Sequence, residues 1–402
     1  MMVSLPLGIG SLEFGTLILY SFLGVFCMIC IKKACVAGIP GERKVPGAFW
    51  FALFFGVMAV FAVFRDISVG ADFGVYKEFF DTIDSGSLIS ERLKEYKSGY
   101  FWLTYFCKKT LGSFNAYIFV CYAIMLLGYI VFMSTYCKRP DALSFVPFLI
   151  VVFFYIRALT ELKTALSASC FLIFLSCLKP RKTGYAILGL VFLFLSLELH
   201  LFTIAAFAPF VIFWYLFRDR ISGWSRIKFV LWIIIPVALS LAVIRYVKGQ
   251  LDIYAPLYDL IRGDIRDYLQ MSATNVWQGL VIEHWIMLIP HGALFVFMLI
   301  FWKELGKSRS SVLAKAACTW DIMIMPACTY ANVWRENSIL FMTRIMMWAE
   351  IVRIIEKHCP EKRKKLLKIL AFLVFFGWFL FRIFSEAQDL GVDTYVFDFS
   401  PK

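Results

Sequence analysis

The chain has 402 residues, of which 61% are hydrophobic and 17% are charged, and its mean hydropathy is +0.77. Soluble domains carry about 25% charged residues, so this composition excludes a soluble globular protein and indicates an all-α polytopic membrane protein. The formal net charge of +13 would suit a nucleic-acid-binding protein. The positions of the basic residues favour a membrane topology instead, and no nucleic-acid partner is expected.

A membrane-spanning helix needs about 20 predominantly apolar residues. Twelve stretches are predicted to be such helices, at residues 12–31, 46–64, 114–136, 144–159, 164–178, 185–200, 201–217, 229–247, 281–301, 317–334, 338–355 and 369–385. Residues 100–111 form a shorter apolar stretch that includes Lys108 and Lys109, which predicts an interfacial or re-entrant helix. Residues 1–402 are therefore expected to form a single integral membrane domain.

Lysine and arginine residues concentrate in alternate short loops between the predicted spans. They are Lys32, Lys33, Arg43 and Lys44; Lys138 and Arg139; Lys179, Arg181 and Lys182; Arg218, Arg220, Arg226 and Lys228; Lys303, Lys307, Arg309 and Lys315; and those of residues 353–368. The positive-inside rule predicts that these loops are cytoplasmic. Both termini and the two long polar loops, 65–99 and 248–275, are then expected on the outer, periplasmic face.

The loop 65–99 begins with a charged pair, Arg65 and Asp66, at the outer end of the second predicted span. A polar loop is predicted after it, from the residues Gly70, Asp72, Gly74 and Tyr76. A basic residue, a carboxylate and a phenol just beyond the bilayer have the chemistry to hold an anionic, sugar-bearing lipid.

Other polar residues also lie at outer ends of predicted helices, although an ionisable group costs about 2.5–3.5 kcal/mol at the centre of a span. They are Arg157, Glu161 and Lys163; Glu198 and His200; Arg245; Glu283 and His284; Arg335 and Glu336; and Arg344. Arg157 and Glu161 are spaced to share a helical face. Each basic side chain could instead be an anchor that reaches the headgroups, and a histidine could be a hydrogen-bonded structural residue.

The second long loop contains a helical pattern at residues 256–269, which predicts an amphipathic helix on the outer leaflet. Arg262 and Arg266 lie on its polar side, spaced so that their guanidinium groups could grip a phosphate. A simple lid over the helical bundle is the alternative interpretation.

The outer loops lack the ligand spacings of a metal site, so neither a catalytic metal nor another cofactor is expected. Most of the 11 cysteines lie inside apolar runs or in predicted cytoplasmic loops, which argues against a disulfide framework. Cys27 and Cys30 have the spacing of a redox motif, but inside a membrane helix they are better explained by packing.

Several residues occur in the order of a known family pattern. They are Arg65, Gly70, Asp72 and Tyr76; Glu95 with Gly99 and Tyr100; Lys163, Thr164, Ala165 and Leu166 at a helix start; His200 before an apolar run that ends in Pro209; and Arg344 in a later helix. This order resembles the EpsG-like membrane proteins, which include Wzy-type O-antigen and capsule repeat-unit polymerases. The resemblance covers about residues 60–215. The family pattern usually has arginine where this chain has Lys163. The lysine keeps the positive charge but lacks the bidentate hydrogen-bonding fork of a guanidinium group.

The resemblance implies a metal-independent glycosyltransferase with a GT-C-like helical bundle in the bacterial inner membrane, its active site facing the periplasm. The donor would be a growing glycan on undecaprenyl pyrophosphate, and the acceptor a repeat unit on the same carrier. Cationic ligands for the pyrophosphate would come from Arg65, Arg157, Lys163, Arg262, Arg266 and Arg344, with Tyr76 reading the sugar. Candidates for the base are His200, placed first, and Asp72, Glu161 and Glu198. A flippase and a chain-length regulator would be possible partners.

Three other activities fit the same class of sequence. An O-antigen ligase would differ from a polymerase only in its acceptor. A flippase or exporter of lipid-linked oligosaccharide is expected to carry charges at mid-membrane depth, whereas this chain concentrates them at outer helix ends. A membrane acyltransferase would need a path for its acyl donor from the cytoplasm, but the predicted cytoplasmic loops are short and basic.

Overall fold

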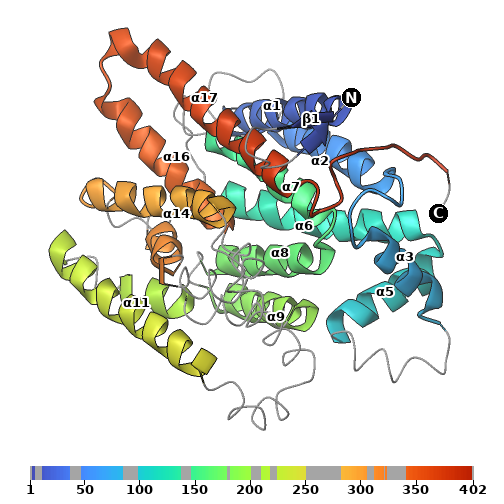
Figure 1. Cartoon of the computed structure of the whole chain (residues 1–402). Helices are drawn as coiled ribbons and strands as arrows, with labels where there is room; N and C mark the ends of the chain where they lie inside the picture. Colours follow the sequence, from blue (N-terminus) through green and yellow to red (C-terminus); the bar gives the residue numbers. More distant parts are fainter. Residues whose placement is uncertain are drawn as a thin grey trace. The chain divides into compact units, whose positions relative to one another are not determined.

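The computed structural model describes residues 2–4, 11–36, 47–84, 98–136, 146–178, 182–200, 210–217, 224–249, 282–305, 312–320, 322–323 and 341–400. The chain forms two compact units, unit 1 with residues 1–204 and 348–402, and unit 2 with residues 205–347. Figure 1 shows that the described parts of both units are almost entirely helical. The all-α prediction is therefore confirmed.

Unit 1 begins with an antiparallel pair of short strands, β1 (Met2–Ser4) and β2 (Ser11–Glu13). Its helices are α1 (Phe14–Val36), α2 (Gly47–Val63), α3 (Phe73–Thr82), α5 (Ser98–Leu111), α6 (Phe114–Tyr136), the 3-10 helix η2 (Val146–Ile150), α7 (Val151–Ala158), α8 (Leu162–Cys177), α9 (Thr183–Leu199) and α17 (Glu361–Glu386). Unit 2 contains α11 (Arg226–Gly249) and α14 (Ile282–Ile300), and α16 (Phe341–His358) runs from unit 2 into unit 1.

Among the described residues, 3 helices are long and apolar enough to cross a membrane: Phe14–Ala34, Phe114–Tyr136 and Glu361–Glu386. Shorter apolar helices lie at Phe49–Val63, Val146–Ala158, Leu162–Cys177, Thr183–Leu199 and Ile289–Ile300. These helices agree with a membrane protein, while the full set of twelve spans stays a prediction. The loop segment 248–275, with its amphipathic helix at 256–269, lies outside the described residues except for its first two positions.

Helices α6, α8 and α9 lie side by side in unit 1, with α8 packed between the other two (Figure 1). Every side chain of α8 except that of Lys163 is buried. Small residues bring the helices close together, because a Cβ on Gly128 of α6 would lie 2.6 Å from the Ser169 carbonyl oxygen of α8. On the other side of α8, the Ser167 hydroxyl donates to the Ser196 carbonyl oxygen at 2.7 Å.

The outward surface of α9 is apolar along most of its length. Its exposed large side chains are Tyr185, Ile187, Leu188, Leu190, Val191, Phe194 and Leu195. In water such a continuous apolar patch would favour aggregation. In a bilayer the same patch contacts the apolar acyl chains of the lipids. This surface therefore supports a membrane location for unit 1.

The residues after α17, here called the C-terminal segment (387–400), run along the loop that follows α2. The backbone N–H of Asp66 donates to Val396 at 2.8 Å, and that of Gly70 donates to Gly391 at 2.7 Å. Gly70 has a φ of 98°, a conformation that favours glycine. The N–H of Glu13 likewise donates to the carbonyl of Asp393 at 2.9 Å. Both terminal regions and the loop after α2 thus meet at one end of unit 1.

The predicted polar loop over Gly70–Tyr76 is shorter in the structure, because helix α3 begins at Phe73 and includes Gly74 and Tyr76. The physical reason is an apolar stripe at helical spacing: Phe73, Tyr76, Phe79 and Phe80 are all buried. Asp72 occupies the N-cap position, where aspartate is common. The glycines and the aspartate that suggested a loop instead surround a helix start.

Candidate functional site

Arg65 lies at the point where α2 gives way to the loop, and its side chain is 0% exposed. Its guanidinium carbon is 3.7 Å from the centre of the Phe73 ring, and its Nη1 donates to the Tyr122 hydroxyl at 3.2 Å. A buried charge is costly unless such partners replace water. The backbone of Arg65 pairs with Phe397 of the C-terminal segment. Arg65 therefore occupies an aromatic interior, and its role as a ligand stays a prediction.

The turn between α7 and α8 brings Arg157 and Glu161 into a bidentate ion pair. Nε of Arg157 donates to Oε2 of Glu161 at 2.9 Å, and Nη2 donates to Oε1 at 3.0 Å. The two residues were expected to share a helical face, but α7 ends at Ala158 and Glu161 is the N-cap of α8. The turn itself, closed by a bond from the Glu161 N–H to the Arg157 carbonyl at 3.0 Å, brings the side chains together.

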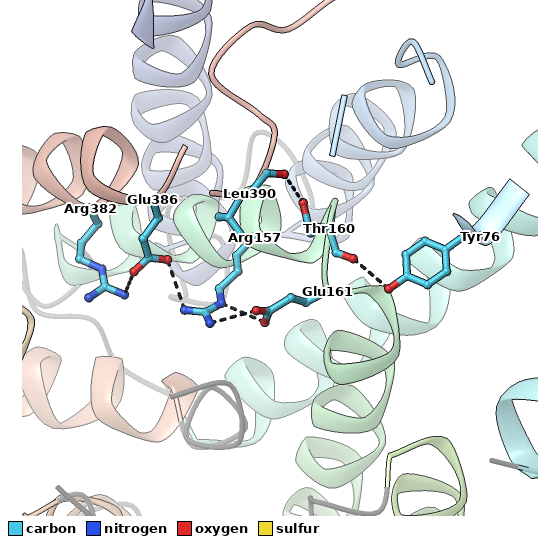
Figure 2. A network of polar contacts seen from close by, with 7 residues as sticks. All are labelled: Tyr76, Arg157, Thr160, Glu161, Arg382, Glu386 and Leu390. Carbon is cyan, nitrogen blue, oxygen red and sulfur yellow. Dashed lines mark hydrogen bonds and ion pairs between the residues drawn. The ribbon is translucent and has the colours of Figure 1, made fainter. Parts of the chain in front are cut away.

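Helix α17 adds a second ion pair to the first (Figure 2). Nη1 of Arg157 donates to Oε2 of Glu386 at 3.2 Å, and the other oxygen of Glu386 pairs with Arg382 one turn earlier. We call Arg157, Glu161, Arg382 and Glu386 the charge cluster. Their side chains are between 6% and 13% exposed. Two positive and two negative groups balance, which makes such close burial tolerable.

Thr160 connects the charge cluster to helix α3 and to the C-terminal segment (Figure 2). The Tyr76 hydroxyl donates to the Thr160 carbonyl at 2.9 Å, and the Thr160 hydroxyl donates to the Leu390 carbonyl at 2.5 Å. Burial, followed by the charge of Asp72, raises the pKa of the Tyr76 hydroxyl well above its ordinary value. Tyr76 is thus a fixed donor in this structure, buried and pointing at the backbone.

A second group of predicted residues surrounds the beginning of α5. Nζ of Lys163 lies 4.9 Å from the centre of the Tyr100 ring. A Cβ on Gly99 would lie 2.8 Å from Cβ of Glu198 and 3.0 Å from its backbone carbon, so only glycine fits at this contact. His200 follows as the C-cap of α9 in an extended conformation, with φ −153°. The motif residues Gly99 and Tyr100 are therefore next to Lys163 and Glu198.

The structure thus brings together many of the predicted residues of unit 1. Arg157, Glu161 and Tyr76 belong to one hydrogen-bonded network, Lys163 and Glu198 contact the start of α5, and Asp72 is half-buried at the N-cap of α3. Arg344 is buried within unit 2. Arg262 and Arg266 lie outside the described residues. Within the described part of the chain, no group of three or more His, Cys, Asp or Glu side chains could hold a metal ion.

Sequence reasoning missed Arg382 and Glu386 as members of the site. Both lie at the end of the last predicted span, with the spacing of opposite charges that forms ion pairs along a helix. That spacing at a helix end predicted to be outer is the same signal that drew attention to Arg157 and Glu161. Chemically, guanidinium groups are suited to phosphate oxygens, and carboxylates can accept protons.

The helical fold, the three helices long enough to span a membrane among the described residues, and the buried cluster of arginines and carboxylates in unit 1 are consistent with an all-α membrane protein that carries a polar cluster. The sequence profile of the EpsG family matches residues 48–397, so the chain belongs to the EpsG family, a Wzy-type polymerase-like family. The resemblance noted in the sequence is confirmed. No curated protein and no solved structure matches the chain.

Proposed function

We propose that the protein is a polysaccharide polymerase that transfers a growing glycan from undecaprenyl pyrophosphate to a lipid-linked repeat unit. Membership of the EpsG family, which indicates a polysaccharide polymerase-type role, supports this proposal. The observation that carries it furthest is the Arg157 guanidinium, held at a helical hairpin among carboxylates. Such a group can bind the pyrophosphate, and it is fixed by two helices rather than by a mobile loop.

In the proposed reaction a hydroxyl of the acceptor sugar attacks the anomeric carbon of the donor. The bond from that carbon to undecaprenyl pyrophosphate breaks, and the leaving group keeps the electron pair. Arg157 and Lys163 offset the negative charge that develops on the pyrophosphate. A protein group takes the proton of the hydroxyl. We assign metal-independent catalysis because fixed cations can supply this charge stabilisation.

The choice of the catalytic base depends on the hydrogen bonds that each candidate carboxylate already accepts in the structure. Both oxygens of Glu161 accept hydrogen bonds from Arg157, so Glu161 has to leave that pair before it can accept a proton. Glu198 lies in the last turn of α9 beside Gly99, and His200 is the C-cap of the same helix. We therefore keep His200 as the first candidate for the base, with Glu198 as its neighbour and alternative.

We also propose that the site faces the periplasm at the bacterial inner membrane. The alternation of basic loops supports this orientation. A flippase would need charges along the transport path at mid-membrane depth, whereas the charge cluster lies where α7, α8 and α17 end or begin. That position favours transfer at the surface of the membrane.

The deciding experiment is deletion of the gene, followed by separation of the cell's glycans by size. Loss of long glycan with retention of single capped repeats is the expected result, and expression of the wild-type chain should restore the long forms. Loss of every glycan-bearing form of lipid A would contradict the proposal and favour a ligase or a flippase. Purified protein given the lipid-linked repeat should elongate it in the presence of a chelator such as EDTA.

A further inference from the structure

The central feature of the charge cluster is that Arg157 is shared between two carboxylates from different helices. Its Nε and Nη2 bind Glu161, which is close in sequence, whereas its Nη1 binds Glu386 of α17 at 3.2 Å. The bond to Glu386 is the longest of the three. Glu386 differs from Glu161 in a second way, because it has another cationic partner in Arg382.

We propose that Glu386 holds the phosphate-binding edge of Arg157 until a pyrophosphate displaces it, and that Arg382 then retains Glu386. This inference rests on the proposed function, because it assigns the pyrophosphate of the lipid-linked donor to this cluster. Carboxylate and phosphate oxygens fit the same edge of a guanidinium group, so one can replace the other. Glu386 and Arg382 are thus positioning residues that act through Arg157.

Burial explains why the exchange needs Arg382. The side chain of Glu386 is 10% exposed, and a carboxylate left there without a cation would carry a large desolvation cost. Arg382 lies one turn earlier on the same helix, so it stays beside Glu386 whatever Arg157 does. Its guanidinium carbon also lies 4.9 Å from the centre of the Phe153 ring, which fixes it against α7. Glu386 can therefore release Arg157 without becoming an isolated charge.

Glu386 also lies where a small movement is possible. It is the last residue of α17, and the C-terminal segment begins immediately after it. The N–H of Leu390 bonds to the Glu386 carbonyl at 2.9 Å, so the backbone stays in place while the side chain moves. The exchange then requires only a side-chain rotation, not an opening of the helical core.

The inference predicts opposite effects for two neutralising substitutions. Glu386→Gln removes the competitor of the ligand and should tighten pyrophosphate binding about tenfold, which corresponds to about 1.4 kcal/mol. Arg382→Gln leaves Glu386 with Arg157 as its one cationic partner among the described residues and should weaken binding about tenfold, by the same conversion. A cluster with a purely structural role would show the same change, lower stability, for both substitutions.

The double variant separates exchange from a simple effect of net charge. If Arg382 acts through Glu386, adding Arg382→Gln to Glu386→Gln should change little, and the double variant should bind like Glu386→Gln. If only the local charge matters, the two changes should cancel and restore wild-type binding, which would overturn the inference. Glu350→Gln is the matched control, because Glu350 pairs with Arg353 at 2.9 Å on α16. It should leave binding unchanged.

The measurement is the dissociation constant of inorganic pyrophosphate for the purified full chain in phosphatidylcholine nanodiscs, with thermal unfolding recorded for each variant. If the Glu386→Gln protein accumulates poorly, the Arg382→Gln variant still tests the inference. Pyrophosphate binding by Arg382→Gln that is unchanged or tighter than that of the wild type overturns it. Displacement of pyrophosphate by added phosphatidylglycerol would reassign the cluster to bilayer headgroups and overturn it as well. Wild-type protein that elongates glycan but binds no pyrophosphate refutes the exchange alone. Binding that behaves as expected without elongation refutes the proposed function instead.

Discussion

Replacement of Gly99 by alanine is the sharpest structural test of the contact between α5 and α9. The added Cβ would lie 2.8 Å from Cβ of Glu198 and 3.0 Å from its backbone carbon and oxygen. Non-bonded carbon atoms prefer separations of about 3.5–4.0 Å, so the start of α5 would have to move by about 0.7 Å. Two of the three contacting atoms belong to the backbone, so a side-chain rotation cannot relieve the clash.

We expect Gly99→Ala to destabilise the protein by about 1–3 kcal/mol, the usual cost of overpacking a tight contact. The effect on glycan elongation should be larger than the effect on folding. Displacement of α5 moves Tyr100, whose ring lies against Lys163, and displacements of about 1 Å can reduce rates about 100-fold. Thermal unfolding of purified protein and the length distribution of the glycan measure the two effects separately.

Gly74→Ala is the matched control for Gly99→Ala. A Cβ at Gly74 of α3 would meet nothing within 4 Å, and alanine is favoured over glycine inside a helix by about 1 kcal/mol. This substitution should leave stability unchanged or raised and glycan length normal. A Gly99→Ala protein with wild-type unfolding temperature and wild-type glycan would refute the proposed contact between Gly99 and Glu198.

Four further substitutions test individual parts of the site. Arg65→Ala should lower protein abundance and glycan together, because it empties a fully buried position; normal abundance on immunoblots would contradict this. Arg157→Lys should keep the protein folded but shorten the glycan strongly, because an ammonium cannot form the bidentate pair; wild-type glycan length would argue against a role for the fork. Lys163→Arg should retain elongation if that position binds pyrophosphate, and its loss would count against that role. Thr160→Val removes the bond to Leu390 and should cost about 0.5–1.5 kcal/mol in thermal unfolding, with an unchanged midpoint as the contrary result.

Apolar patterning predicted the long helices well. The span predicted at 114–136 coincides with α6, and the one at 164–178 differs from α8 by only a few residues. Such helices are defined by local composition, because each satisfies its own backbone hydrogen bonds. The short helix α3 was missed because its start contains glycine and aspartate, and its buried aromatic stripe spans only a few turns.

The site was only partly predictable, for a different physical reason. Arg157 and Glu161 are close in sequence, so spacing alone suggested that they meet. Glu386 joins Arg157 from 229 residues away, and the backbone of Arg65 pairs with that of Phe397 near the C-terminus. Contacts of this kind are decided by the packing of whole helices, which no local pattern reports. The sequence could therefore assign these polar residues to one end of the helical bundle, but it could not predict which residues they contact.

The contacts of the C-terminal segment have a consequence for how the protein is made. Thr160 bonds to a residue 230 positions later, and Thr16 accepts a bond from the N–H of a residue 379 positions later. During synthesis, Arg65 after α2 and Arg157 on α7 are made long before residues 387–400 leave the ribosome. The polar end of unit 1 is therefore completed only after α17 has been inserted. A chain interrupted before α17 would lack the backbone pairing of Arg65 with Phe397 and the ion pair of Arg157 with Glu386.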